Sequence, residues 1–129
     1  MKYDLKAIGK KNKAHALHLR RKARVRKIIS GTKERPRLSV FKSAKHIYVQ
    51  AIDDVAAVTL ASAGSLESGI REGSKGLKKC EVAKLVGEAL GAKLKQANFS
   101  NAVFDRNGFR YTGRIAAVAE GIRSCGLQI

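Results

Sequence analysis

The alternation of apolar and polar residues in the middle of the chain predicts β-strands. Between residues 37 and 42, Leu38 and Val40 point one way and their neighbours point the other, and residues 47–52 repeat the pattern. A period of two places alternate side chains on opposite faces of a sheet, so these segments, joined by a short polar turn, predict a β-hairpin. After an Asp-Asp turn, residues 58–63 predict a third strand.

Apolar residues recur at helical spacing in the last part of the chain. Their spacing of three and four predicts amphipathic helices over residues 80–96 and 113–125. Residues 102–104 predict a short buried strand between them, and Gly126 before an apolar residue is typical of a Schellman-type helix end. Residues 64–76, rich in Ser and Gly, predict a loop that has room for one helical turn. The expected core positions of the two helices are Val82, Leu85, Val86, Ala89, Leu90 and Leu94, then Ile115, Val118, Ala119 and Ile122.

Another helix is predicted near the N-terminus, over residues 14–30, with Gly31 as its C-terminal cap. Residues 1–13 hold five Lys and no periodic apolar pattern, which predicts a flexible basic arm. We therefore expect an α/β fold, a small mixed β-sheet flanked by helices, with residues 14–129 as a single domain behind the arm. The helix has a narrow apolar stripe of Leu17, Val25, Ile28 and Ile29.

Positive charge is concentrated at the start of the chain. The first 37 residues hold 14 of the 27 Lys and Arg against two acidic residues, a net charge of +12 out of +17 for the chain. Charge at this density repels itself, so it indicates a polyanionic partner, either nucleic acid or an anionic membrane surface. The apolar stripe lacks the bulky face that inserts into membranes, which favours nucleic acid. The alternative is a merely solvated helix, although such helices usually mix both signs of charge.

Aromatic and cysteine content narrow the class of partner and the compartment. The chain has four Phe, three Tyr and no Trp, fewer rings than a sheet that reads single strands by stacking would use. Binding to folded RNA through phosphates and shape is therefore favoured. Cys80 and Cys125 have no partner spacing, which predicts two reduced core thiols in a cytosolic protein.

The segment 105–114 follows a predicted strand, contains two glycines and leads into a helix. Helix N-termini in this context bind phosphate, and Gly108 and Gly113 have the spacing of a nucleotide-binding P-loop. Arg114 and Ile115 break that motif, because they replace its Lys and its metal-binding hydroxyl. This disfavours a nucleotidase, and the same residues fit either an RNA phosphate site or a tight turn that needs glycines.

The three histidines suggest no metal site. His15 and His18 lie three apart on the basic helix, but their cationic neighbours disfavour a bound cation. His46 lies in the hairpin turn, where it is either an RNA contact or a plain turn residue. No serine-histidine-aspartate grouping has a nucleophile turn, so we expect no enzyme, cofactor or small-molecule substrate.

Three stretches together resemble one family. Residues 36–52 resemble its hairpin motif RPRLxVxRSxxHIYAQxI, residues 103–114 its loop motif FDRxGxxYHGR, and the C-terminal residues its ADAAREAGLxF ending. The chain is thereby identified as a member of the bacterial-type ribosomal protein L18 family. Thr112 stands where the family usually has His, and Ile129 replaces the usual terminal Phe.

The resemblance implies a cytoplasmic, structural, non-enzymatic constituent of the large ribosomal subunit. It implies binding to 5S rRNA, attachment of that RNA to large-subunit rRNA in the central protuberance, and a neighbouring 5S-binding ribosomal protein. A general double-stranded RNA-binding protein without ribosomal specificity is the alternative. The residues expected at the RNA are Arg20, Arg21, Lys22, Arg24, Arg26 and Lys27 of the helix; Arg35, Arg37, Ser43, Lys45, His46 and Tyr48 around the hairpin; and Arg106, Asn107, Gly108, Arg110, Tyr111, Thr112, Gly113 and Arg114 of the loop.

Overall fold

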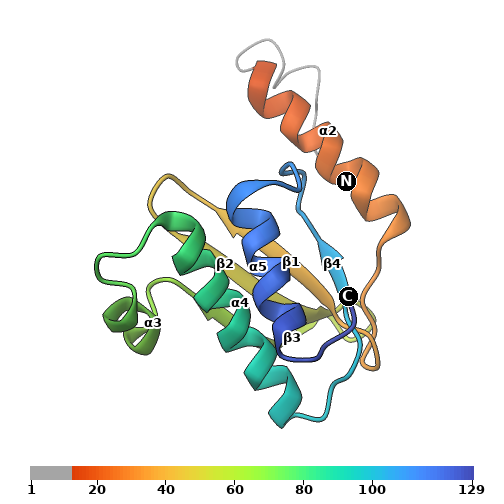
Figure 1. Cartoon of the computed structure of the whole chain (residues 1–129). Coiled ribbons are helices and arrows are strands. Elements are labelled where there is room, and N and C mark those ends of the chain that lie inside the picture. Colours follow the sequence, from red (N-terminus) through yellow and green to blue (C-terminus); the bar gives the residue numbers. More distant parts are fainter. Residues whose placement is uncertain (1–12) are drawn as a thin grey trace.

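The computed structural model describes residues 13–129, so the predicted basic arm lies outside the described residues apart from Lys13, which begins the first helix. Every predicted helix and strand is present, with boundaries within one or two residues of those expected. The elements, labelled as in Figure 1, are α2 (Lys13–Ile28), β1 (Arg37–Lys42), β2 (Ile47–Asp53), β3 (Val58–Gly64), α3 (Ser68–Gly73), α4 (Lys79–Gln96), β4 (Val103–Asp105) and α5 (Gly113–Ser124).

The four strands form one mixed sheet in the order β3-β2-β1-β4. Strand β1 pairs antiparallel with β2 on one side and parallel with β4 on the other. The parallel pair needs a long crossover, which α4 supplies. The predicted small mixed sheet with helices beside it is therefore confirmed, with β1 in a central position.

Helices α4 and α5 lie side by side across one face of the sheet and close the core (Figure 1). The alternation predicted for β1 is confirmed, because Leu38 and Val40 are fully buried beneath these helices. The predicted face of α5 is confirmed at all four positions, whereas on α4 Val86 is buried and Val82, Leu85 and Ala89 are only partly buried. Leu90 and Leu94 of α4 and Ile122 of α5 have no exposed surface.

Glycines let α4 and α5 approach each other at backbone distance. A Cβ on Gly87 would collide with the carbonyl group of Val118, and a Cβ on Gly121 would collide with the carbonyl oxygen of Lys84. A Cβ on Gly91 would lie 2.7 Å from the Sγ atom of Cys125. Glycine lowers helix propensity, so the close packing of these two helices must compensate for it.

Helix α2 lies outside this core, beyond the edge of the sheet, and its predicted apolar stripe is wrong (Figure 1). Leu17 is 43% exposed and Ile28 is 85% exposed, whereas the buried side chains are Ala16 and Leu19. The helix docks through a short segment near its middle, so periodicity along its whole length did not identify the contact.

The expected cap at Gly31 is also wrong. Helix α2 ends at Ile28, and Gly31 is not among the glycines with positive φ. Gly31 is instead buried, and a Cβ there would lie 2.7 Å from the Cβ of Arg37. The position needs glycine for close packing and not for helix capping.

The prediction of a Schellman-type end for α5 agrees with the structure, whereas the prediction that both cysteines are buried does not. Gly126 has φ +89° and its N–H donates to the Arg123 carbonyl oxygen at 2.9 Å, one of the two bonds of a Schellman motif. Both cysteines are free thiols, but Cys80 is exposed and Cys125 only partly buried, so the expectation of two core thiols is wrong. Cys80 lies in the first turn of α4, ahead of the residues that reach the core.

Candidate nucleic-acid interface

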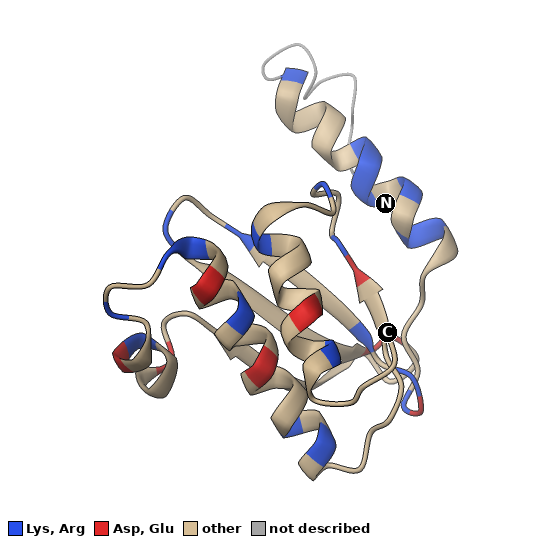
Figure 2. Ribbon diagram, viewed as in Figure 1, with Lys and Arg blue, Asp and Glu red and all other residues tan. Residues whose placement is uncertain are grey.

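Helix α2 presents Lys and Arg without any acidic residue along its length. Figure 2 shows the Lys and Arg residues of α2, together with others at the tip of the 106–114 loop and at the hairpin turn. Most acidic residues lie on or beside α3, α4 and α5. Arg20, Arg24 and Lys27 are exposed. Arg26 is exposed and lies 3.7 Å from an Asp54 carboxylate oxygen. A one-sign surface of this kind attracts a polyanion.

The 106–110 segment fixes α2 to the body of the protein. The Nε atom of Arg21 donates to the Gly108 carbonyl oxygen at 3.0 Å, and the rings of His18 and Phe109 lie 4.6 Å apart between centroids. Gly108 has φ +79°, and a Cβ there would lie 2.8 Å from the His18 carbonyl oxygen and 2.9 Å from the Lys22 nitrogen. Glycine therefore permits both the turn and the contact with the helix backbone.

The turn itself is set by the end of strand β4. The buried carboxylate of Asp105 accepts a hydrogen bond from the Asn107 N–H at 2.8 Å, and Asn107 has φ +52°. Asn107 and Gly108 are both buried, so of the residues expected at the RNA these two shape the loop from inside. Their positive φ angles explain the Asn-Gly pair, because both residue types tolerate the left-handed conformation.

Arg37, also expected at the RNA, points into the protein. Its guanidinium group donates to Asp105 at 2.8 Å and to Asp54 at 2.9 Å, and the residue is 6% exposed. Asp54 also accepts the Gly31 N–H at 2.7 Å. The hydrogen bond from Arg37, with further help from Gly31, holds the pKa of Asp54 below its ordinary value despite partial burial. This ion-pair network connects the start of β1 to the end of β4 and to the turn after β2.

The hairpin turn between β1 and β2 is fixed against the N-terminal ends of α4 and α5. Arg114 donates to the Ser43 carbonyl oxygen at 2.9 Å, and Lys79 donates to the Ala44 carbonyl oxygen at 2.7 Å. The His46 ring nitrogen Nδ1 lies 3.1 Å from the Ser65 hydroxyl oxygen, so His46 has a structural partner. Ser43 and Lys45 are exposed at the tip.

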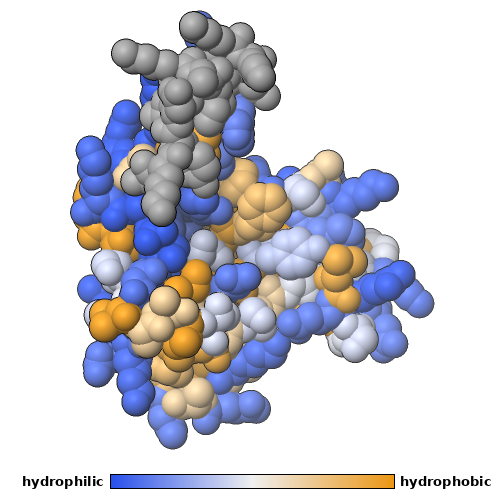
Figure 3. Space-filling view, turned by 180° about the vertical axis from the view of Figure 1, so that it is seen from behind, coloured by the Kyte–Doolittle hydropathy of each residue, from blue (hydrophilic) through white to orange (hydrophobic). Residues whose placement is uncertain are grey.

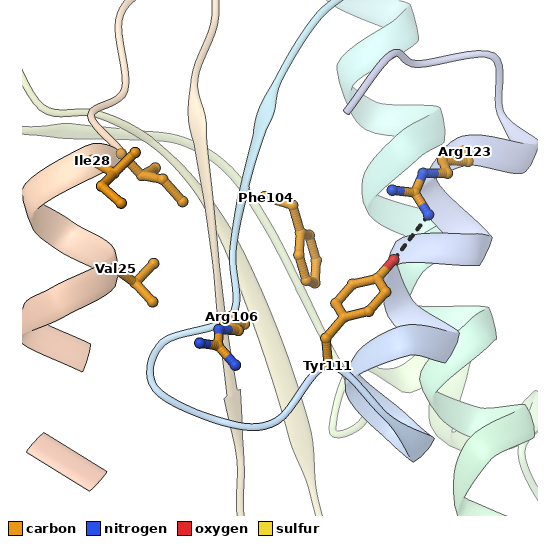
Figure 4. A pocket seen from close by; sticks show the side chains of 7 residues that line it. Val25, Ile28, Phe104, Arg106, Tyr111 and Arg123 are labelled. Carbon is orange, nitrogen blue, oxygen red and sulfur yellow. Dashed lines mark hydrogen bonds between the residues drawn. The ribbon is translucent and has the colours of Figure 1, made fainter. Parts of the chain in front are cut away.

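An open groove of about 410 Å³ separates α2 from the 104–111 segment and α5. Figure 4 shows apolar side chains of α2 on one side and the two rings of Phe104 and Tyr111 on the other. These rings meet edge to face at 5.8 Å, and Arg123 donates to the Tyr111 hydroxyl oxygen at 2.9 Å. The lining residues are Val25, Ile28, Ile29, Phe104, Arg106, Tyr111 and Arg123.

The remaining residues expected at the RNA lie at or near the surface. Tyr111 is 43% exposed, and Lys22, Tyr48, Arg106 and Arg114 are partly buried. Gly113 has φ +57°, and a Cβ there would meet nothing within 4 Å. Arg35, Arg110, Thr112 and Gly113 are exposed as well.

Three residues near this surface escaped the sequence analysis: Lys79, Phe41 and Lys42. Lys79 reaches the hairpin turn from a helix that begins 35 residues later, and nothing in its local sequence indicates this contact. The sequence pattern could have identified Phe41, because strand alternation places this large apolar residue on the face opposite to the core. Lys42 follows it, with its ammonium group 5.4 Å from the centre of the Phe109 ring.

Residues 13–129 contain no group of three or more His, Cys, Asp and Glu side chains that could hold a metal ion. Within the same residues, no helix combines the length and the apolar character that crossing a membrane requires.

Comparison with known proteins gives one consistent result. The family model for ribosomal L18 of archaea, bacteria, mitochondria and chloroplasts matches residues 11–129. The large ribosomal subunit protein uL18 of Desulfosudis oleivorans is 48% identical over 123 residues, which cover 94% of this chain and 99% of the relative. The uL18 proteins of Myxococcus xanthus and Shouchella clausii are 54% and 49% identical, over 85% and 94% of this chain and 92% and 98% of the relatives.

Proposed function

The chain belongs to the ribosomal L18 family, structural and non-enzymatic constituents of the large ribosomal subunit in the cytoplasm, and from this premise we propose that it binds 5S rRNA. We further propose that it helps attach 5S rRNA to large-subunit rRNA in the central protuberance, beside another 5S-binding ribosomal protein.

The observation that supports this proposal best is the docked, acid-free helix α2. Its cations stand on a helix whose orientation is fixed by the Arg21–Gly108 hydrogen bond and by the packing of Gly108 against the helix backbone. A rigid row of charges suits the regularly spaced phosphates of a folded RNA, because little conformational entropy is lost on binding. A free basic tail would lack this fixed geometry.

The proposed interface consists of the accessible members of the expected set. Arg37 is omitted because its guanidinium group is buried and paired, and Asn107 and Gly108 are omitted as direct contacts because they are buried in the loop. The proposed RNA-facing residues are Arg20, Lys22, Arg24, Arg26, Lys27, Arg35, Ser43, Lys45, His46, Tyr48, Arg106, Arg110, Tyr111, Thr112, Gly113 and Arg114, with Arg21 orienting the helix.

A competition experiment distinguishes this function from general double-stranded RNA binding. The full-length protein is bound to labelled 5S rRNA at moderate salt, and unlabelled 5S rRNA or an unrelated structured RNA of equal length is added. We expect 5S rRNA to compete far better. Equal competition by both RNAs would contradict the proposal and support the general binder.

A salt titration tests the role of α2. With about eight phosphates neutralised, the logarithm of the binding constant should fall against the logarithm of salt concentration with a slope of about −6 to −7. The double variant Arg20→Ala/Arg24→Ala should reduce the magnitude of that slope by about two, because each substitution removes one phosphate contact. The control Lys75→Ala/Lys95→Ala removes two exposed cations elsewhere and should leave the slope unchanged. The same slope for the Arg variant and wild type would exclude α2 from the interface.

The attachment role has its own measurement. Labelled 5S rRNA is incubated with large-subunit rRNA, with and without this protein and the neighbouring 5S-binding protein, and sedimentation of the label is followed. We expect the heavy fraction of the label to rise when this protein is present. Binding to 5S rRNA without any such rise would limit the function to binding alone.

A further inference from the structure

One face of the sheet is left open by the helices. Helices α4 and α5 cover the side that contains Leu38 and Val40, and strand alternation sends Phe41 to the opposite side. Figure 3 views the molecule from that side and shows hydrophobic side chains in the middle, with hydrophilic ones around them. Phe41 is 51% exposed on this side of the sheet.

Aromatic side chains from three parts of the chain meet around Phe41. Tyr48 is its cross-strand neighbour, and the Tyr48 ring lies over Gly64, where a Cβ would be 2.6 Å from the ring atom Cδ1. The Phe109 ring lies 6.2 Å from the Phe41 ring at 71°, and His18 follows at 4.6 Å from Phe109. We call these four side chains, Tyr48, Phe41, Phe109 and His18, the aromatic strip.

The strip is bordered by cations. Next to it is a hollow of about 530 Å³, and none of the residues that line it is acidic: His15, His18, Leu19, Lys22, Phe41, Lys42, Asn107 and Phe109. Lys42 places its ammonium group 5.4 Å from the Phe109 ring. Burial, and then the charges of Arg21, Lys22 and His15, lower the pKa of His18, which favours the uncharged form of its ring. The strip therefore presents aromatic rings, inclined to one another, inside a positive border.

This combination fits one kind of occupant. An exposed ring offers a stacking surface to any nucleobase, and adjacent Lys side chains neutralise the phosphates on either side of it. We propose that Phe41, supported by Phe109 and Tyr48, stacks on an unpaired base of the bound RNA while Lys22 and Lys42 contact its flanking phosphates. The inference rests on the proposed function and extends it from phosphate contacts to contact with a base. Three of the seven Phe and Tyr residues of the chain belong to the aromatic strip.

The affinity of the full-length protein for 5S rRNA tests the stacking. Phe41→Ala should weaken binding by about 5-fold to 150-fold, the range for one stacked base. It should leave the salt slope unchanged, because no charge is lost. Phe41→Leu keeps the apolar side chain without the ring and should lose nearly as much. The control Val58→Ala, which trims another half-exposed apolar residue of the sheet, should have no effect. Thermal melts check that each variant is folded.

A fluorescence measurement tests the same contact directly. The chain has no Trp, so Phe41→Trp introduces a unique emission signal at the proposed stacking site. We expect the emission to be quenched by 5S rRNA, and at low salt by a short single-stranded oligoribonucleotide of mixed sequence. Emission that ignores both RNAs, or binding by Phe41→Leu equal to wild type, would overturn the stacking. If the emission changed only when large-subunit proteins without RNA were added, the aromatic strip would bind a protein partner, and the stacking proposal would be wrong. If the wild-type protein did not bind 5S rRNA but the oligoribonucleotide quenched the emission of Phe41→Trp, the proposed function would be wrong and the stacking of a base on the strip would still stand.

Discussion

Replacement of Arg37 is expected to destabilise the fold and to leave the RNA interface intact. Arg37→Met keeps most of the side-chain volume but removes the guanidinium group that pairs with Asp54 and Asp105. Asp105 has no exposed side-chain surface, so the variant leaves a buried carboxylate without its counter-ion. Breaking a buried pair in this way costs about 3–5 kcal/mol, which is a large part of the about 5–15 kcal/mol typical of a domain.

The assay is thermal and urea unfolding with a matched control. A loss of this size should lower Tm by about 10–20 °C in a domain of this length. Arg35→Met removes the same charge two residues earlier from an exposed side chain and should change Tm very little. Adding Asp54→Asn and Asp105→Asn to the Arg37 variant should recover part of the loss, because the unpaired charges are then gone.

The opposite pattern would refute the reasoning. If Arg37→Met kept the wild-type Tm and reduced the salt slope of 5S rRNA binding by about one, Arg37 would be a phosphate contact and not an internal anchor.

Two further outcomes follow from the loop and the ion-pair network. Gly108→Ala places a Cβ against the backbone of α2 at a residue with positive φ, so it should release α2 from the loop. Limited proteolysis between α2 and β1 should become faster, the affinity for 5S rRNA should fall at least about tenfold, and Tm should fall by the equivalent of about 1–2 kcal/mol. A variant in which α2 stays resistant to protease would contradict this. The pKa of Asp54 is lowered in the folded state, so its contribution to stability is present above its unfolded pKa of about 4 and is lost as the pH falls through the folded pKa. In Asp54→Asn, the free energy of unfolding should therefore fall less steeply than in wild type below about pH 4. The same pH dependence in both proteins would contradict a stabilising role of the Asp54 carboxylate.

Much of the fold could be predicted because its elements repeat with a regular period. The hairpin faces, the apolar face of α4 and the buried positions of α5 all follow from which side chains a strand or helix aligns. The family resemblance, read from the hairpin and loop motifs, is confirmed by the comparisons. These are properties of local sequence, and local sequence was sufficient for them.

The parts that could not be predicted depend on contacts between distant residues. Arg37 and Asp105 are 68 positions apart, and Arg21 and Gly108 are 87 positions apart. A basic residue before a strand looks the same in sequence whether it meets a carboxylate or a phosphate. The exposure of Ile28 has the same origin, because α2 docks through the segment around Gly108 and not along its whole apolar stripe.

The glycines between α4 and α5 have a practical consequence for engineering a more heat-resistant protein. Exchanging helical Gly for Ala is a common route to higher stability, because Ala restricts the unfolded chain. Gly87 and Gly121 must be spared, since a methyl group at either position would force two helix backbones apart. Gly69 in α3 has open space around it and no positive φ, so Ala there should add about 0.5–1 kcal/mol. Consensus-style redesign that treats all helical glycines alike would therefore damage the layer that closes the core.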